Sequence, residues 1–496
     1  MTGSSPPSRV PTLTRRTLLG GAAAGIAALT GGCTLVGGGS KSGSGPTIRI
    51  ALIPDPTGAS AFYRTQFDKF TEQTGITVEV IENPAAQQVN AVQLMFKQGN
   101  PPDVYRAQGA ALDSFNSQGW AADLTAYADK DKVADRLGAA NLDPRTSGLH
   151  RDGKLLSLPL VAGNWSSANL LLWSKSGLAE VGATKPPATI SELDQVARAI
   201  SAKGKGKYYG YAFTTALGRP AADVSMLINQ AAPSSIWGTS WDLRTGKVAY
   251  TDPGLLRSVE FYRKLHADGV VEPGWQTWEP TRAYTEFAKG TTAMFLGSCY
   301  QVNEIKKLSP DLDFGVAPAP VPDTGRVGYA GQPYSFSPIW SMSSQSKNPE
   351  AAWKLMNFLV SEEFQRAYFE TFRSFTAVTS AWKGKSTLSA QESQMVDVLS
   401  ATIKRIPDPT VVGSAAVRQA MIDFSGNPDF VFASLASQAI SRNQPIDALA
   451  KDQQQKVEAF WSTEFAKLND AGKKISAADF TYADWDLLKD WTPAGR

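Results

Sequence analysis

The feature that most constrains the fold is a repeating order of apolar patterns between residues 47 and 105. Residues 47–53 (TIRIALI) predict a buried strand, and the alternation of residues 76–80 predicts a second one. A stretch with helical spacing of apolar side chains follows each strand, and a third strand begins at Pro101. This order predicts a parallel sheet whose strands are joined by right-handed helical crossovers.

Such a sheet also predicts where a ligand binds, because ligands of open α/β sheets lie beyond the carboxyl ends of the strands. Asp55 comes directly after the first predicted strand, and Gln108 comes after the third. Both side chains can bind the hydroxyl groups of a ligand, but both positions also suit an ordinary turn. Asp55 and Gln108 are therefore candidate ligand-binding residues, with a turn as the alternative for each.

The composition excludes several kinds of functional site. Two Cys and two His among 496 residues are too few for a disulfide scaffold, an iron–sulfur cluster or a Cys/His zinc site. The net charge is +3, and three arginines in the first 32 residues supply it, so the rest of the chain is neutral. A neutral chain with 13 Trp, 14 Tyr and 22 Phe favours a flat, uncharged partner over nucleic acid. We expect no cofactor, no metal ion and no nucleic-acid partner.

The N-terminal segment has the pattern of an export signal. Arg15 and Arg16 precede an apolar stretch, residues 18–29, that is too short and too rich in Gly and Ala to remain in a bilayer as a helix. The adjacent arginines favour the twin-arginine type of signal, with a plain secretory signal as the alternative. We predict that residues 1–32 direct the chain out of the cytoplasm.

The residues around Cys33 indicate a lipid anchor. Two glycines precede Cys33, as at a bacterial lipoprotein processing site, although Thr30 stands where Leu is usual. Residues 33–46 are rich in Gly and Ser, which predicts a flexible tether. We therefore expect Cys33 to be lipidated and the protein to be an extracytoplasmic lipoprotein anchored in the cell membrane.

Four segments resemble the extracellular solute-binding proteins of ABC importers, in the sugar-binding group (family 1) that includes maltose-binding protein. They are QGNPPDV at 98–104 with QGWAADL at 118–124, the stretch from DGKL to PP across 152–187, FAKGTTAMFLG at 287–297 and SKNPEAAW at 346–353. Each motif alone is weak, but their order along residues 47–465 is specific. The chain departs from the family pattern at Trp173-Ser174, usually Tyr-Asn, and at Ser298-Cys299-Tyr300, where a Trp is common.

The resemblance implies a two-lobed α/β fold of the periplasmic-binding-protein type. Each lobe would be a mostly parallel sheet flanked by helices, and a hinge would join the lobes. We expect the chain to cross between lobes near Pro159 and in the proline-rich stretch 317–322. The first lobe would comprise residues 47–158 and 320–372, and the second lobe residues 159–319 and 373–496.

A sugar presents an apolar face and a rim of hydroxyl groups, so its site needs aromatic rings and planar hydrogen-bonding side chains. Asn164 and Trp165 follow the predicted crossing among Gly, Asn and Ser residues, which suits a ligand site better than a core. The resemblance implies a stacking aromatic at Tyr300.

Further aromatic and amide candidates lie elsewhere in the chain. They are Trp237, close to Trp241; Trp278, close to Trp275; and Gln332 with Tyr334 in a glycine-containing loop. One Trp of each pair is expected to be structural. Trp340, Trp353 and Trp382 are assigned to packing.

The resemblance implies a function in transport rather than catalysis. The protein would be the membrane-tethered, monomeric substrate-binding component of an ABC transporter, which captures a mono- or oligosaccharide between its lobes and delivers it to the permease. The same fold with a non-sugar solute is one alternative. A secreted glycoside hydrolase is another, and it would require two carboxyl groups about 5–9.5 Å apart across a cleft.

Overall fold

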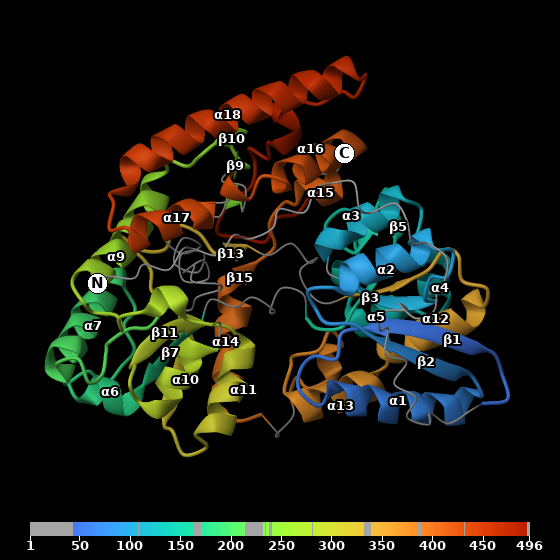
Figure 1. The fold of residues 1–496 in the computed structure, drawn as a ribbon, viewed down its shortest axis with the longest axis horizontal. Coiled ribbons are helices and arrows are strands. Elements are labelled where there is room, and N and C mark those ends of the chain that lie inside the picture. The colour runs from blue at the N-terminus through green and yellow to red at the C-terminus, as the bar shows by residue number, and fades with distance from the viewer. Residues whose placement is uncertain are drawn as a thin grey trace, which may run out of the picture.

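The computed structural model shows two α/β lobes side by side (Figure 1). The first lobe, on the right of the view, contains the N-terminal strands, and the second lobe contains most of the C-terminal half. The structure describes residues 43–107, 109–162, 170–213, 232–233, 235–237, 241–279, 281–331, 339–384, 388–430 and 432–493.

The first lobe is built on a five-stranded sheet of order β2-β1-β3-β14-β6. The strands are β1 (Thr47–Leu52), β2 (Thr77–Glu82), β3 (Val104–Ala107), β6 (Leu158–Pro159) and β14 (Ile339–Met342). Strand β1 pairs in parallel with β2 and β3, as the sequence predicts. Strand β14 is antiparallel to both β3 and β6. The helices of this lobe are α1 (Ala59–Thr74), α2 (Gln88–Lys97), α3 (Gly109–Ser117), α4 (Thr125–Lys130), α5 (Val133–Leu137), α12 (Pro349–Leu359) and α13 (Glu362–Phe372).

The second lobe has a three-stranded sheet of order β11-β7-β12. Its strands are β7 (Leu170–Ser174), β11 (Met294–Gly297) and β12 (Phe314–Pro318), and β7 is antiparallel to both neighbours. In this described part of the sheet, β11 and β12 run the same way on either side of the antiparallel β7. Parallel bridges between Tyr209 and Thr292 and between Tyr211 and Val271 add to the pairing in this lobe.

The crossings between lobes explain where the antiparallel strands occur. Strand β6 is the last strand before the chain leaves the first lobe, β7 is the first in the second lobe, and β14 is the first after the return. Strands β11 and β12 run the same way because α11 (Cys299–Leu308) joins them as a crossover helix, with β7 inserted between them. A strand that enters from the other lobe is not delivered by such a crossover and is free to pair in the opposite direction.

Helices cover the second sheet and extend toward the C-terminus. They are α6 (Lys175–Ala179), α7 (Ile190–Gly204), α9 (Pro253–Ala267), α10 (Arg282–Lys289), α11, α14 (Ala390–Thr402), α15 (Pro409–Val412), α16 (Ala415–Ser425), α17 (Phe432–Ser441) and α18 (Ile446–Asp470). Short strands complete the lobe: β8 (Ile236–Trp237), β9 (Trp241–Asp242), β10 (Lys247–Val248), β13 (Ala330–Gly331) and β15 (Ile403–Lys404). In the described part of the chain, none of the helices combines the length and apolarity needed to cross a membrane.

Each lobe has its own hydrophobic core. One cluster joins β1, β3, α1, α12 and α13, and the other joins β7, β11, α7, α9, α14, α17 and α18. Trp340 and Trp353 lie in the first cluster and Trp382 in the second, all of them buried, which confirms their assignment to packing. Between the lobes two chain segments lie side by side, since Val161 bridges Thr376 and the N–H of Ala162 donates to the carbonyl of Phe375 at 2.9 Å.

Candidate functional site

The carboxyl ends of β1 and β3 bring an acidic and a basic residue together in the first lobe. Asp55 lies in the loop after β1, and Arg106 lies in β3. The Nη1 of Arg106 donates hydrogen bonds to the carbonyl oxygens of Ile53 and Asp55, both at 3.1 Å. Arg106 is buried and holds the backbone of this loop, whereas Asp55 is exposed.

Two buried tyrosines lie next to this pair. Tyr63 belongs to α1 and Tyr368 to α13. Burial raises the pKa of the Tyr63 phenol, and the nearby positive charge of Arg106 opposes this rise. Burial also raises the pKa of Tyr368, whose surroundings include Tyr63, Arg106 and Asp55. The first lobe therefore offers neutral phenols, one cation and one exposed carboxylate in a small volume.

The second lobe contributes Tyr300 from the first turn of α11. Ser298 precedes this helix and its N–H donates to Oε1 of Gln301 at 2.8 Å, so a capping box fixes the helix start. Tyr300 is 50% exposed although it is a large aromatic residue. Its ring meets that of Tyr284 edge to face, with 6.2 Å between the ring centroids. This geometry leaves one face of Tyr300 open to a ligand.

The charge of Asp55 in the first lobe forms part of the electrostatic surroundings of Tyr300 in the second lobe. Burial raises the pKa of Tyr300, and the charges of Tyr284, Glu304 and Asp55 raise it further. Asp55 belongs to the first lobe and the other groups to the second. An effect of Asp55 on Tyr300 requires that their side chains be close, because charge interactions across solvent fade within about 10 Å.

The arrangement suits recognition of a polyhydroxylated ligand. Tyr300 offers a ring for stacking, Asp55 accepts hydrogen bonds from hydroxyl groups, and phenols both donate and accept. Among the described residues, no three His, Cys, Asp or Glu side chains are placed to hold a metal ion.

The predicted site residues fall into three groups. Asp55 and Tyr300 are both exposed, one on each lobe. Trp278 lies in the core of the second lobe, 8% exposed, with the Arg282 guanidinium 5.8 Å from the centre of its ring. Its neighbour Trp275 is fully buried and donates from Nε1 to Nδ1 of His266 at 3.1 Å. Both members of this Trp pair are thus engaged in packing.

The other candidates have less structural description. Trp237 lies in β8, which pairs with β9. Gln108, Asn164, Trp165, Gln332, Tyr334 and Cys33 lie outside the described residues.

Sequence reasoning did not identify Arg106, Tyr63 or Tyr368. A signal existed for Arg106, because an Arg at the end of an otherwise apolar strand must find polar partners when it is buried. No such signal exists for the two tyrosines, whose positions on amphipathic helices are equally consistent with plain core residues.

Comparison with known proteins places the chain in a family. It belongs to the bacterial extracellular solute-binding proteins, whose family model matches residues 65–395. A binding protein of Brucella abortus is 28% identical over 267 residues, which cover 54% of this chain and 60% of the relative, so the chain spans less than two thirds of that protein. The maltodextrin-binding protein of Bacillus subtilis is 22% identical over 395 residues, 77% of this chain and 84% of the relative.

Solved structures share the fold. An ABC transporter solute-binding protein of Thermotoga lettingae, solved with α-D-tagatose, superposes with a TM-score of 0.62 at 18% identity, covering 84% of this chain and all of that protein. The two-lobed α/β fold predicted from the sequence is therefore confirmed.

Proposed function

We propose that this protein captures a carbohydrate between its two lobes and delivers it to the transmembrane subunits of an ABC importer. The observation that carries the proposal is an exposed carboxylate, Asp55, at a strand end of the first lobe together with a half-exposed aromatic ring, Tyr300, on the second lobe, in a chain of the solute-binding family. A carboxylate and a half-exposed aromatic ring from opposite lobes can bind a sugar from both sides at once. Binding then favours the closed arrangement of the lobes, because only that arrangement provides both contacts.

Relatives support the ligand class. The Bacillus subtilis relative is described as binding maltodextrin, and the Thermotoga lettingae protein was solved with tagatose. A sugar also agrees with the neutral charge of the chain beyond residue 32 and with its many aromatic residues. A non-sugar solute or a glycoside hydrolase would share the fold, so the test must separate these alternatives.

The remaining predicted residues complete the proposal. Asn164, Trp165, Gln108, Gln332 and Tyr334 would supply further stacking and hydrogen bonds, and Trp237 is retained as a candidate. We propose hinge motion at the crossings near Pro159, before β14 and after Phe372. The return to the first lobe is placed before β14 and not at 317–322, because Val321 bridges Thr189 and β13 pairs with β15, both in the second lobe.

The location of the protein follows from the same proposal. Members of its family are extracellular, and Cys33 with the Gly/Ser tether would keep the protein at the outer face of the membrane as a monomer. Two acyl chains suffice for stable anchoring. Expression of Cys33→Ala should release the protein from the membrane fraction, and a variant that stays bound would refute lipid anchoring at this residue.

A titration of intrinsic fluorescence tests the function. The chain has 13 Trp, and lobe closure changes the surroundings of those near the site. We expect saturable quenching or enhancement by one member of a panel containing maltose, maltotriose, tagatose and xylobiose, with that sugar recovered intact. Cleaved sugar would support the hydrolase. A response only to non-sugar solutes such as amino acids or polyamines would refute the carbohydrate proposal.

A further inference from the structure

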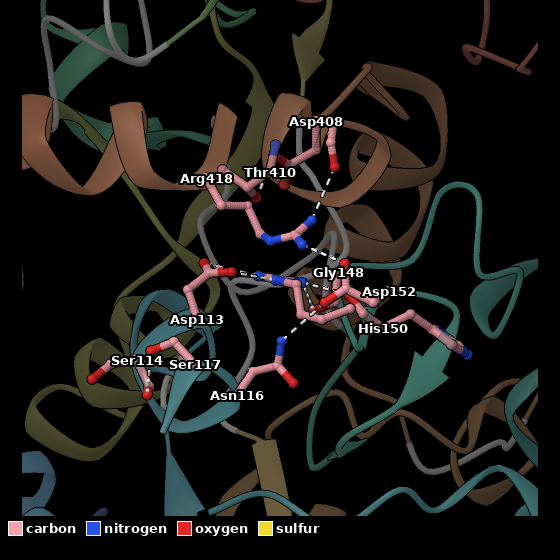
Figure 2. A network of polar contacts seen from close by, with 12 residues as sticks. Asp113, Ser114, Asn116, Ser117, Gly148, His150, Asp152, Asp408, Thr410 and Arg418 are labelled. Atoms are coloured by element: carbon pink, nitrogen blue, oxygen red, sulfur yellow. Dashed lines mark hydrogen bonds and ion pairs between the residues drawn. The ribbon is translucent and has the colours of Figure 1, made fainter. Parts of the chain in front are cut away.

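A second group of polar side chains joins the two lobes, separate from the group around Asp55. From the first lobe it involves α3 and the hairpin of β4 (His150–Arg151) and β5 (Lys154–Leu155). From the second lobe it involves α15 and α16. Figure 2 shows the side chains of Asp113 and Asp152 on one side and those of Asp408 and Arg418 on the other.

In the first-lobe half of this contact, the buried Arg151 donates four hydrogen bonds. Arg151 is 2% exposed. Its Nε and Nη2 bind the two carboxylate oxygens of Asp113 at 2.5 and 3.2 Å. Its Nη1 donates to the carbonyl oxygens of Gly148 at 2.9 Å and His150 at 2.7 Å. A bidentate Arg–carboxylate pair of this kind fixes the hairpin against α3.

Arg418 of α16 reaches across to Asp152 at the hairpin turn. Arg418 is buried, and its Nη1 donates to the carbonyl of Gly413 at 2.9 Å. Its Nη2 forms an ion pair with Oδ1 of Asp152. The other oxygen of Asp152 accepts a hydrogen bond from Nδ2 of Asn116 at 3.3 Å. Asp152 is thus shared between an α3 side chain of its own lobe and an arginine of the other lobe (Figure 2).

Asp408 is a buried carboxylate at the same contact. Its Oδ1 caps α15 by accepting from the N–H and Oγ1 of Thr410, at 2.9 and 2.7 Å. Burial raises the pKa of Asp408, Arg151 from the first lobe lowers it, and Asp113 raises it. Charges of the first lobe therefore act directly on a side chain of the second.

These second-lobe residues lie on one continuous segment, residues 403–418, which we call the strap. Strand β15 begins it and pairs in parallel with β13. The C-terminal tail contacts it through two hydrogen bonds. The N–H of Trp491 donates to the carbonyl oxygen of Arg405 at 2.8 Å, and the N–H of Arg405 donates to Oδ1 of Asp490 at 2.7 Å. In Figure 1, α15 and α16 lie next to α3 and β5 in the upper half of the view, whereas α13 and α11 lie in the lower half.

We propose that the strap holds the lobes together, and that Arg418 and Asp152 are positioning residues that set how easily the lobes separate. The role in lobe separation stands on the contacts alone. The consequence for ligand affinity rests on the proposed function, because a ligand held by both lobes binds in proportion to the closed fraction.

Charged groups of both lobes meet at this contact. Arg418 pairs with Asp152 while Asp408 lies buried beside them, and burial of a carboxylate is costly unless a cation compensates it. Arg151 supplies that cation from the first lobe. Removal of either member of the Arg418–Asp152 pair is therefore expected to shift the lobe equilibrium toward separation.

Small-angle scattering of the ligand-free full chain tests the proposal. Asp152→Asn is the main variant, because Asp152 has a positive φ of 51°, a conformation that Asn also tolerates, and its side chain is 57% exposed. Arg418→Ala is the partner variant, and Arg263→Ala is the matched control, since Arg263 pairs with Glu260 inside the second lobe.

We expect Asp152→Asn and Arg418→Ala each to raise the open fraction about fivefold, seen as a larger radius of gyration. The double variant should match the single ones, because both remove the same interaction. Raising NaCl from 20 to 500 mM should expand the wild type and leave the variants unchanged. The control should match the wild type throughout.

Two results would overturn the proposal. An unchanged radius of gyration in both single variants would make the pair a surface contact without influence on the lobes. Equal expansion in Arg263→Ala would point to general loosening. Failure to bind any sugar would affect the proposed function but not this measurement, because no ligand is present in it.

Discussion

The lobes face each other in two chemically different regions. Asp55 and Tyr300 are themselves exposed above buried side chains such as Tyr63 and Tyr368, and neither Asp55 nor Arg106 takes part in an ion pair among the described residues. Where the strap meets the first lobe, the charged side chains of Arg151, Asp408 and Arg418 are buried and hydrogen-bonded. Charged side chains that already have hydrogen-bond or ion-pair partners hold the lobes together. Exposed side chains without ion-pair partners in the described structure are available to bind a ligand.

The largest effect on stability is expected at Arg151, which makes the most hydrogen bonds among the described residues at the contact between the strap and the first lobe. Arg151→Ala removes the partner of Asp113 and a cation that offsets the buried Asp408. Breaking a buried pair in this way should lower the free energy of unfolding by about 3–5 kcal/mol, measured by urea denaturation. Arg145→Ala is the control, because Arg145 forms an exposed pair with Asp143 nearby, and it should leave stability almost unchanged. Similar losses in both variants would contradict the difference in burial.

An intermediate effect is expected from His150, which precedes Arg151 in the hairpin. Burial lowers the pKa of His150 to about 4. The negative charges of Asp143 and Asp123 oppose this shift, and the positive charge of Arg151 adds to it. The unfolded chain binds this proton near pH 6.5, so the stability due to neutral His150 is present above that pH and is lost as the pH falls toward 4. Across this pH range the loss in the free energy of unfolding corresponds to about 3 kcal/mol.

His150→Phe should remove this part of the pH dependence while it keeps a buried ring. The measurement is the free energy of unfolding from urea titrations at pH 7.5, 5.5 and 4.5. We expect the wild type to lose more stability than the variant between the first and last of these values. Parallel curves would show that His150 does not resist protonation in the folded protein.

The smallest effect, and one on binding rather than stability, is expected at Tyr300. Tyr300→Ala should weaken binding of the sugar identified by titration by about 1–2 kcal/mol, roughly tenfold or more in Kd, through loss of stacking and apolar contact. The midpoint of thermal unfolding should barely change because the ring is half exposed. Trp275→Ala is the control, since this fully buried ring should cost stability instead. A large drop in the Tyr300→Ala midpoint would assign Tyr300 to packing.

Local patterns predicted the first lobe well. The predicted strands at 47–53 and 76–80 correspond to β1 and β2, and their parallel pairing followed from the intervening helix. These features depend on residues close in sequence, whose periodicity is visible directly. The antiparallel strands β7 and β14 could not be predicted in this way, because their direction depends on where the chain crosses between lobes.

The candidate site was predictable only in part, for a related reason. Asp55 follows a strand end, so a general rule for parallel sheets selects it. Tyr300 came from a family resemblance, and its exposure in the first turn of α11 shows that it is accessible. The Arg418–Asp152 contact joins residues 266 positions apart in the chain, and such a pair cannot be predicted from the pattern of neighbouring residues in the sequence.

The position of β14 has a consequence for how the chain folds. Strand β14 fills the place between β3 and β6, both of which are made before residue 160, whereas β14 begins only at Ile339. During synthesis, β3 and β6 therefore lack their shared neighbour, and their sheet edges stay unpaired, until most of the chain has been made. Pairing over such long separations is intrinsically slow, and open edges invite aggregation. The first lobe thus depends for its completion on residues that the ribosome adds after nearly all of the second sheet, and a nascent chain of this protein would benefit from a chaperone over that interval.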